Sequence, residues 1–213
     1  MNKLRITEIF FSLQGETNTV GLPTVFIRLT GCPLRCQYCD TAYAFHGGKW
    51  CDLNTIIAEV KRHRTPYVTV TGGEPLVQKS CLVLLKRLCD DGFNVSLETS
   101  GALDVSLVDA RVVKVIDIKT PGSQEVEKNN WDNLTHLLSH DQIKFVLCDR
   151  DDYDWAKQIL AQYRLSEKCQ VLFSPSYEQL NPTELAEWIL HDQLPVRMQI
   201  QLHKFLWGNA PGR

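Results

Sequence analysis

The sequence lacks any long hydrophobic run. No stretch of the chain approaches the about 20 consecutive apolar residues that a membrane-spanning helix needs. The first eight residues, M-N-K-L-R-I-T-E, also lack the apolar core of a signal peptide. These absences predict a cytoplasmic protein with no membrane partner.

The sequence also lacks an excess of charge of either sign. Its 23 Lys and Arg residues nearly balance 25 Asp and Glu residues, for a formal net charge of -2. Strong basic charge is typical of proteins that bind nucleic acid, so this balance predicts no direct nucleic-acid partner. With 44% apolar residues among 213, the chain can form one well-cored domain, and we expect a single domain over residues 1–213.

Cysteine, in contrast, is plentiful, with eight residues. In a cytosolic chain this number favours metal ligands and reduced, buried thiols over disulfides. Two cysteines, Cys81 and Cys89, fall on the apolar side of a predicted helix, and Cys148 and Cys169 adjoin apolar runs. We expect these four to be small core residues.

Three further cysteines stand close together in the segment G-C-P-L-R-C-Q-Y-C-D, which follows a β-branched apolar run. Cys32, Cys36 and Cys39 form a C-x3-C-x2-C array. Three thiolates from one loop can hold three corners of an iron–sulfur cube, and no fourth cysteine continues the spacing, so one iron would be open to another ligand. The alternative is a structural zinc site with Cys51 or His46 as the fourth ligand.

Strand and helix patterns alternate along the rest of the chain. Expected strands cover residues 4–11, 24–30, 67–71, 94–98, 112–118, 142–147, 169–173 and 196–202, and expected helices cover 52–63, 76–91, 151–163 and 182–191. Residues 123–138 read as a long loop with a short helix at 131–138. About six strand–helix units fall short of the eight of a closed barrel, so we expect an α/β fold, an open partial (β/α)6 barrel, with ligands at the carboxyl ends of its strands.

Two features near those strand ends suggest ligand contacts. Arg28 lies inside an apolar strand, where an unpaired guanidinium is very costly, so it needs an anionic ligand or an acid such as Glu16 or Glu74. The turn at residues 72–75, G-G-E-P, lets backbone approach a ligand closely, with Glu74 available to a cation. In the earlier turn S-L-Q-G-E-T, Gly15 can take a positive φ.

Four elements in order resemble the radical S-adenosylmethionine (SAM) superfamily. They are the cysteine array with Tyr38 before its last cysteine, the G-G-E-P turn with Gly73 and Glu74, and two later strand ends. The resemblance implies a 4Fe-4S cluster held by the three cysteines and by SAM. It implies that the G-G-E-P turn holds the methionyl amino group, and that the ribose and the rest of SAM are bound by Glu98, Thr99, Asp117 and Lys119.

The whole chain further resembles the 7-carboxy-7-deazaguanine synthase family of queuosine biosynthesis, a tRNA modification pathway. The matching segments are residues 12–17, 26–32, 39–41, 117–123 and 201–205. The resemblance implies a lyase that converts 6-carboxy-5,6,7,8-tetrahydropterin to a ring-contracted purine analogue. It implies a pterin site whose residues are Gln14, Gly15, Glu16, Arg28, Thr71 and His203. Within this site Arg28 would take the substrate carboxylate, and Thr41 would ligate Mg²⁺ beside the substrate.

The resemblance also implies partners and chemistry. A flavodoxin-type reductant would supply one electron, SAM would give a 5′-deoxyadenosyl radical, and this radical would remove hydrogen from the pterin carbon bearing the carboxylate before ammonia is lost. The family usually forms homodimers. The N-terminal strand and the C-terminal strand and tail would be substrate-binding extensions. Thr17 stands where we expect relatives to have glycine more often.

Two other functions remain compatible with the motifs. A glycyl-radical enzyme activase shares the cysteine array and the G-G-E-P turn, but its protein substrate gives no reason for the Gln14 and Glu16 pair. An iron–sulfur electron carrier would use the cluster without SAM chemistry.

Overall fold

The structure is a computed structural model that describes residues 2–208, 210 and 212. One nine-stranded sheet runs through it in the order β3-β1-β2-β4-β5-β6-β7-β8-β9. β1 pairs antiparallel with β2 and with β3, and every pairing from β2 to β9 is parallel. The strands are β1 (Lys3–Leu13), β2 (Pro23–Leu29), β3 (Lys49–Asp52), β4 (Tyr67–Gly72), β5 (Asn94–Thr99), β6 (Val113–Ile118), β7 (Gln142–Leu147), β8 (Gln170–Pro175) and β9 (Arg197–Met198).

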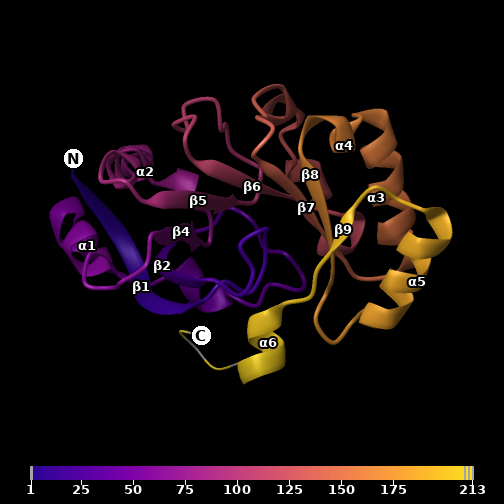
Figure 1. Cartoon of the computed structure of the whole chain (residues 1–213), viewed down its shortest axis with the longest axis horizontal. Coiled ribbons are helices and arrows are strands. Elements are labelled where there is room, and N and C mark those ends of the chain that lie inside the picture. Colours follow the sequence, from indigo (N-terminus) through magenta and orange to yellow (C-terminus); the bar gives the residue numbers. More distant parts are fainter. Residues whose placement is uncertain (1, 209, 211, 213) are drawn as a thin grey trace.

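The sheet is open, because β3 and β9 form its two edges. Figure 1 shows its strands as one twisted layer with helices at both ends. The predicted α/β fold, an open partial barrel, is confirmed.

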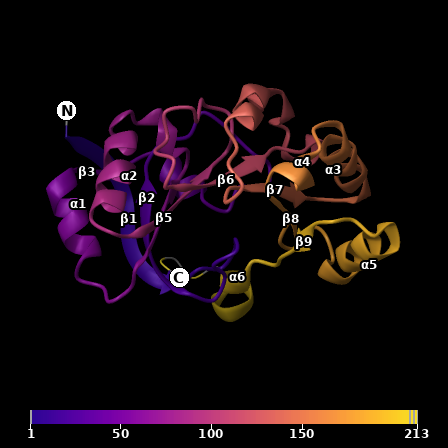
Figure 2. The same ribbon diagram turned by 45° about the horizontal axis from the view of Figure 1, so that its top comes forward.

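Six α-helices flank the sheet among the described residues. Figure 1 and Figure 2 show α1 and α2 at the β1–β5 end and α3, α4 and α5 at the β7–β9 end, with α6 near the C-terminus. No helix of the described residues has the length and apolar content needed to cross a membrane. The helices are α1 (Leu53–Val60), α2 (Ser80–Asp90), α3 (Arg150–Gln162), α4 (Leu165–Lys168), α5 (Pro182–Asp192) and α6 (Leu202–Trp207).

Local sequence signals explain where two of these helices begin. The Asp52 side chain accepts a hydrogen bond from the Asn54 N–H, and Asn181 caps α5 in the same way through Thr183. Pro182 then occupies the first turn of α5, where its missing N–H costs nothing. Between β6 and β7 the long loop holds three short 3₁₀ turns, one of them within the predicted 131–138 helix, at Trp131–Thr135.

The predicted strand at residues 196–202 is wrong in most of its length. β9 ends at Met198. The Gln199 N–H still donates to the Phe173 carbonyl of β8, but the Gln199 side chain and the residues that follow bond to the turn after β1. The Gln199 side chain accepts the Thr17 N–H at 2.8 Å, and the Leu202 N–H donates to the Gly15 carbonyl at 2.9 Å. These bonds pull the chain out of the sheet, and Leu202 then begins α6.

The predicted helix at residues 76–91 is also broken near its start. Residues 75–77 form a 3₁₀ turn, and α2 begins only at Ser80. Between them, the Gln78 amide exchanges hydrogen bonds with the Arg5 backbone and donates to the Thr30 carbonyl. These contacts with β1 and the end of β2 interrupt the helix, and Val77 of the 3₁₀ turn is 47% exposed.

Two smaller features were not predicted. β3, which pairs with the start of β1, lies in a segment to which the sequence patterns assign no strand. Within the S-L-Q-G-E-T segment at residues 12–17, the residue with a positive φ is Thr17 (66°), not Gly15. The residue that we expect to be glycine in relatives is therefore the one in the left-handed region, which glycine adopts most easily.

The prediction of core cysteines is confirmed for Cys81 and Cys169 and only in part for the other two. All eight cysteines are free thiols. Cys81 and Cys169 are buried in the core, whereas Cys89 and Cys148 are half-buried. Large side chains such as Tyr153, Phe145 and Phe173 fill the core around β7 and β8.

Candidate active site

A pocket of about 530 Å³ lies where the carboxyl ends of β2, β4, β5, β6 and β7 meet the cysteine loop and the C-terminal segment. This is the edge at which open parallel sheets bind ligands. Every site residue predicted from the sequence lines this pocket, with the single exception of Glu74. Gly208, Ala210 and Gly212 of the tail line it as well; residues 209, 211 and 213 lie outside the described residues.

The three array cysteines are half-buried and line one wall of the pocket. Their loop turns tightly, since the Cys39 N–H donates to the Cys36 carbonyl at 3.1 Å and the Leu34 N–H contacts the Cys32 sulfur at 3.4 Å. Burial raises the pKa of the Cys36 thiol to about 11, so the thiols carry protons until a metal displaces them.

The G-G-E-P turn packs directly on this loop. A Cβ added to Gly73 would lie 2.3 Å from the Gly31 carbonyl oxygen and 2.8 Å from the Cys32 Cβ. Only glycine allows this approach, and the Glu74 N–H donates to the same carbonyl at 2.7 Å. Soft thiolate donors on a tightly held loop fit three corners of an iron–sulfur cluster.

The fourth zinc ligands considered from the sequence lie elsewhere. Cys51 packs against the hydrophobic core from β3, His46 is exposed, and neither lines the pocket. Across the described residues, no three or more His, Cys, Asp or Glu side chains are gathered around a point that could hold a single metal ion.

Glu74 lies behind the pocket wall and is fully buried. Its carboxylate accepts hydrogen bonds from the Thr99 hydroxyl at 2.9 Å and from the Ser100 N–H and hydroxyl at 2.7 and 2.6 Å. It also accepts the Leu76 N–H at 3.0 Å. In this arrangement Glu74 ties the end of β5 to the G-G-E-P turn, and Thr99 rather than Glu74 lines the pocket.

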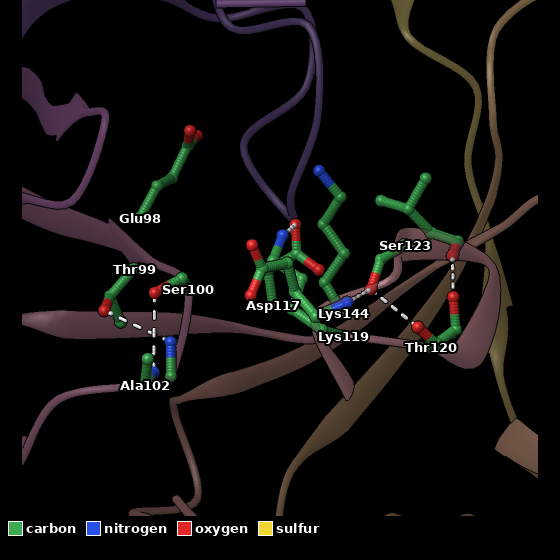
Figure 3. Close-up of polar contacts among 12 residues, drawn as sticks. Glu98, Thr99, Ser100, Ala102, Asp117, Lys119, Thr120, Ser123 and Lys144 are labelled. Atoms are coloured by element: carbon green, nitrogen blue, oxygen red, sulfur yellow. Dashed lines mark hydrogen bonds and ion pairs between the residues drawn. The ribbon is translucent and has the colours of Figure 1, made fainter. Parts of the chain in front are cut away.

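Tyr38, Asp117 and Lys119 form the next part of the wall. Lys119 Nζ pairs with Asp117 at 3.0 Å (Figure 3). It also lies 5.8 Å from the centre of the Tyr38 ring. The hydroxyl of Tyr38 and one carboxylate oxygen of Asp117 are buried and have no hydrogen-bond partner among the described residues. Buried polar atoms without partners fit a polar ligand such as SAM.

Gln14, Glu98 and Thr71 form a second linked group on the pocket wall. The Gln14 amide donates to Glu98 at 3.3 Å and to Thr69 at 3.1 Å, and the Thr71 hydroxyl donates to Glu98 at 3.1 Å. Burial, with the nearby Glu16 carboxylate as the second cause, raises the pKa of Glu98. Glu98, which the resemblance places among the SAM residues, is bonded to the predicted pterin residues Gln14 and Thr71.

Glu16 is held by two side chains that the sequence reasoning missed. Lys144 of β7 forms an ion pair with one of its oxygens, and the Gln201 amide donates to the other at 2.9 Å. Burial pushes the pKa of Glu16 upward, but the Lys144 charge outweighs it, so the pKa lies below its usual range. A lysine inside the apolar β7 segment Q-I-K-F-V-L was the signal, of the kind that identified Arg28.

Arg28 has an acidic partner, but not one of those expected. Its Nε donates to Glu8 of β1 at 2.7 Å, while the expected partners Glu16 and Glu74 bind elsewhere. Tyr43 donates to the same Glu8 oxygen at 2.8 Å, and the guanidinium lies 5.6 Å from the centre of the Phe10 ring. Arg28 still lines the pocket, and Nε is the only guanidinium nitrogen for which the described contacts include a hydrogen bond.

The C-terminal segment lines the pocket and packs against the turn after β1. His203 lies against Gly15, where an added Cβ would come within 2.3 Å of the imidazole Nδ1. Burial lowers the pKa of His203, so its ring is neutral at pH 7. Thr41 stands nearby on the cysteine loop and donates to the Asp40 carboxylate at 2.7 Å.

Comparison with known proteins agrees with this geometry. Residues 26–117, which include the cysteine array and the G-G-E-P turn, match the model of the radical SAM superfamily. The chain is 24% identical to QueE from Escherichia coli, and the two structures superimpose with a TM-score of 0.78 over 94% of this chain and 95% of that one. The fold and the site therefore define a radical SAM protein.

Relatives over the full length narrow this class. The 7-carboxy-7-deazaguanine synthases of Chlorobaculum tepidum and Koribacter versatilis are 46% and 42% identical, over 96% of this chain and 94% and 97% of their own lengths. The synthase of Thermoplasma acidophilum is 36% identical over 97% of this chain and 99% of its own. The chain belongs to the 7-carboxy-7-deazaguanine synthase family.

Proposed function

We propose that this enzyme converts 6-carboxy-5,6,7,8-tetrahydropterin to 7-carboxy-7-deazaguanine by radical SAM chemistry. The proposal depends on one observation: the three array cysteines line the same pocket as the Glu16 carboxylate, the Gln14 amide and the Arg28 guanidinium. The reaction contracts a ring and releases ammonia, so the enzyme is a lyase.

Two walls of the pocket suit the substrate. A pterin presents an edge of N–H donors, and Glu16 and Gln14 offer carboxylate and amide oxygens as acceptors. Arg28 offers nitrogens to the substrate carboxylate, a bond that would offset the cost of burying a guanidinium. Thr71, His203 and the Gly15 backbone complete this side. We place Glu98 here as well, because it bonds to Gln14 and Thr71.

The other walls suit the cofactors. Cys32, Cys36 and Cys39 would hold a 4Fe-4S cluster, and SAM would lie along Gly73, Tyr38, Thr99, Asp117 and Lys119. Bound SAM would supply the 5′-deoxyadenosyl radical that starts the reaction. The chain's own residues fix the position of the substrate and exclude water from it. Glu74 supports this wall from behind through Thr99 and Ser100.

Thr41 would ligate Mg²⁺ beside the substrate. Its hydroxyl and the Asp40 carboxylate lie together at the pocket wall, and hard oxygen donors are those that Mg²⁺ prefers. Substrate and water would complete the shell. A Thr41→Ala variant should lose its rate response to added Mg²⁺ while it retains SAM binding.

Partners and location follow from the same proposal. A flavodoxin-type protein would deliver the electron, a homodimer would be the working form, and the enzyme would act in the cytoplasm. The expected absence of nucleic-acid and membrane partners remains a prediction.

The test uses the anaerobically reconstituted protein with SAM, a reductant and the carboxypterin. We expect the deazapurine product with little net loss of SAM, since hydrogen returns to regenerate it. Formation of 5′-deoxyadenosine only when a partner protein is added would instead identify an activase. Iron and sulfide analysis, with the spectral change on adding SAM, would separate both enzymes from an electron carrier or a zinc protein.

A further inference from the structure

Lys144 is a buried cation for which the pocket's proposed ligands give no obvious role. It lies on β7 between two fully buried side chains, Ile143 and Phe145. Its own side chain is only 12% exposed and lines the pocket. Burying an ammonium is costly even when it is paired, so a lysine here needs a reason.

The contacts of Lys144 point to Glu16. Lys144 holds one oxygen of the Glu16 carboxylate and Gln201 holds the other, so the carboxylate is fixed from both sides. Gln14 adds a third restraint, since its side-chain oxygen accepts the Glu16 N–H at 3.2 Å. Each carboxylate oxygen keeps a further lone pair for a ligand.

Charges around Glu16 would otherwise disfavour its ionised form. Glu98 reaches into the same pocket from β5, on the same side of the sheet as Lys144 (Figure 3). Two carboxylates that share a pocket with little water raise one another's pKa. The titratable and charged groups of other elements that interact with Glu16 or Lys144 are Glu98, Asp117, Asp40 and His203. Arg28 and Lys204 act on this group in turn, through Glu98 and His203.

We propose that Lys144 is a positioning residue for the pterin, because it keeps the Glu16 carboxylate ionised and oriented as an acceptor for the N–H edge. The inference rests on the proposed function and deepens it. A protonated Glu16 would present a hydroxyl donor to an edge made of donors, and the two would repel. Lys144 thus acts on the substrate through Glu16.

A purely structural role is the alternative, since the ion pair also fastens the turn after β1 to β7. The chain offers a matched control in Lys114, which pairs with Asp141 at 2.7 Å with side chains 3% and 0% exposed. That pair does not line the pocket. Loss of a buried lysine there should cost stability without changing pterin binding.

The experiment measures the Kd of 6-carboxy-5,6,7,8-tetrahydropterin by anaerobic calorimetry on the SAM-loaded holoenzyme without reductant. Wild type, K144M, K144R and K114M are compared from about pH 6 to about pH 8.5. We expect K144M to bind at least about 10-fold more weakly at pH 7, and its deficit relative to wild type to shrink as pH rises, since Glu16 then ionises without its partner. K144R and K114M should bind within about threefold of wild type.

Each other outcome overturns the inference. A K144M affinity equal to wild type, or a deficit that is the same at every pH, would mean that Lys144 does not act through the charge of Glu16. An equal loss in K114M would mean a general structural effect. If K144M does not fold, the E16Q/K144M double variant, which leaves no unpaired charge, should bind weakly at every pH, and wild-type affinity in it would overturn the inference. If wild type itself does not bind the carboxypterin, the proposed function fails as well.

Discussion

At the scale of single residues, the sequence predicts which side chains at the strand ends line the site. It does not predict which of these side chains bond to one another. Arg28 stands out because a guanidinium inside an apolar strand needs a partner, yet its observed partner, Glu8, depends on the register of β1 against β2. Lys144 carries the same signal in β7, and Glu16 meets it because the turn after β1 reaches β7, where the Asn18 N–H also donates to the Gln142 side chain. Such contacts join residues far apart in sequence, which no local pattern specifies.

Arg28 should select the carboxylate of the substrate. We expect Arg28→Ala to weaken binding of the carboxypterin by about 100-fold while SAM binding is unchanged, because in the proposed site the guanidinium binds the substrate carboxylate and not SAM. Arg28→Lys should recover part of this loss, since a single ammonium lacks the planar fork. The control is tetrahydropterin without the carboxylate, which wild type and Arg28→Ala should bind equally in calorimetry. Equal weakening of both pterins would instead assign Arg28 a structural role with Glu8.

The two pocket acids should affect stability in opposite ways. Burial and Glu16 raise the pKa of Glu98, so the native state binds more protons than the unfolded chain, and stability falls as pH rises from the unfolded pKa through the folded one. We therefore expect Glu98→Gln to melt above wild type at neutral pH, with the two melting temperatures converging as pH falls toward about 4.5.

Glu16→Gln is the matched comparison. The pKa of Glu16 is below its usual value despite its burial, because of Lys144, so its stabilising effect is present above the unfolded pKa and is lost as pH falls through the folded one. This variant should melt below wild type at neutral pH. Thermal melts in which both variants shift in the same direction would contradict the assignment.

At the scale of elements, capping and periodicity predicted the helices wherever the tertiary structure left the local preference alone. The start of α5 follows its Asn181 cap and Pro182, and α1 follows Asp52. The predicted helix or strand is wrong where the segment instead forms hydrogen bonds with a distant part of the chain. The hydrogen bonds of Gln78 interrupt the predicted helix 76–91, so that α2 begins only at Ser80. The bond from Leu202 to Gly15 draws the end of the predicted strand 196–202 away from the sheet.

Hydrogen bonds between distant segments also support the cysteine loop, although the residue that makes them, Asp152, does not line the pocket. Asp152 in the first turns of α3 is buried and accepts hydrogen bonds from the Thr120 hydroxyl at 2.9 Å, the Gly122 N–H at 2.8 Å and the Cys148 N–H at 3.0 Å. These bonds fix the loop after β6. In the same loop, the Ser123 carbonyl accepts a hydrogen bond from the Gln37 N–H of the cysteine loop at 3.0 Å. Asp152 therefore orders the loop on which the segment between Cys36 and Cys39 rests.

Asp152→Ala should lower the free energy of unfolding by about 3 kcal/mol, because three buried donors lose their acceptor. Urea denaturation measures this loss. Hydrogen exchange should rise in residues 119–125 and at Gln37, with residues 67–72 of β4 as the internal control. A uniform rise across both regions would show global destabilisation and no specific support of the cysteine loop.

At the scale of the whole molecule, alternation of strands and helices was enough to predict an open parallel barrel and the edge at which ligands bind. It did not predict how the two ends of the chain complete the pocket. Gln199, Gln201 and Leu202 all bond to the turn after β1, and His203 lies on Gly15. The first and last segments of the chain therefore meet at one side of the pocket, where the strands between them add Arg28, Thr71 and Glu98. We propose that the pterin binds at this side.

The central claim is that one pocket brings an open iron of a three-cysteine cluster next to a site for a carboxylated pterin. An anaerobic crystal structure of the reconstituted protein with SAM and 6-carboxy-5,6,7,8-tetrahydropterin tests it most directly. The account predicts a cluster bound by Cys32, Cys36 and Cys39 with SAM on the fourth iron, the pterin N–H edge on Glu16, and its carboxylate on Arg28. A fourth protein ligand on the metal, or Arg28 bonded to Glu8 alone with the pterin bound elsewhere, would contradict it.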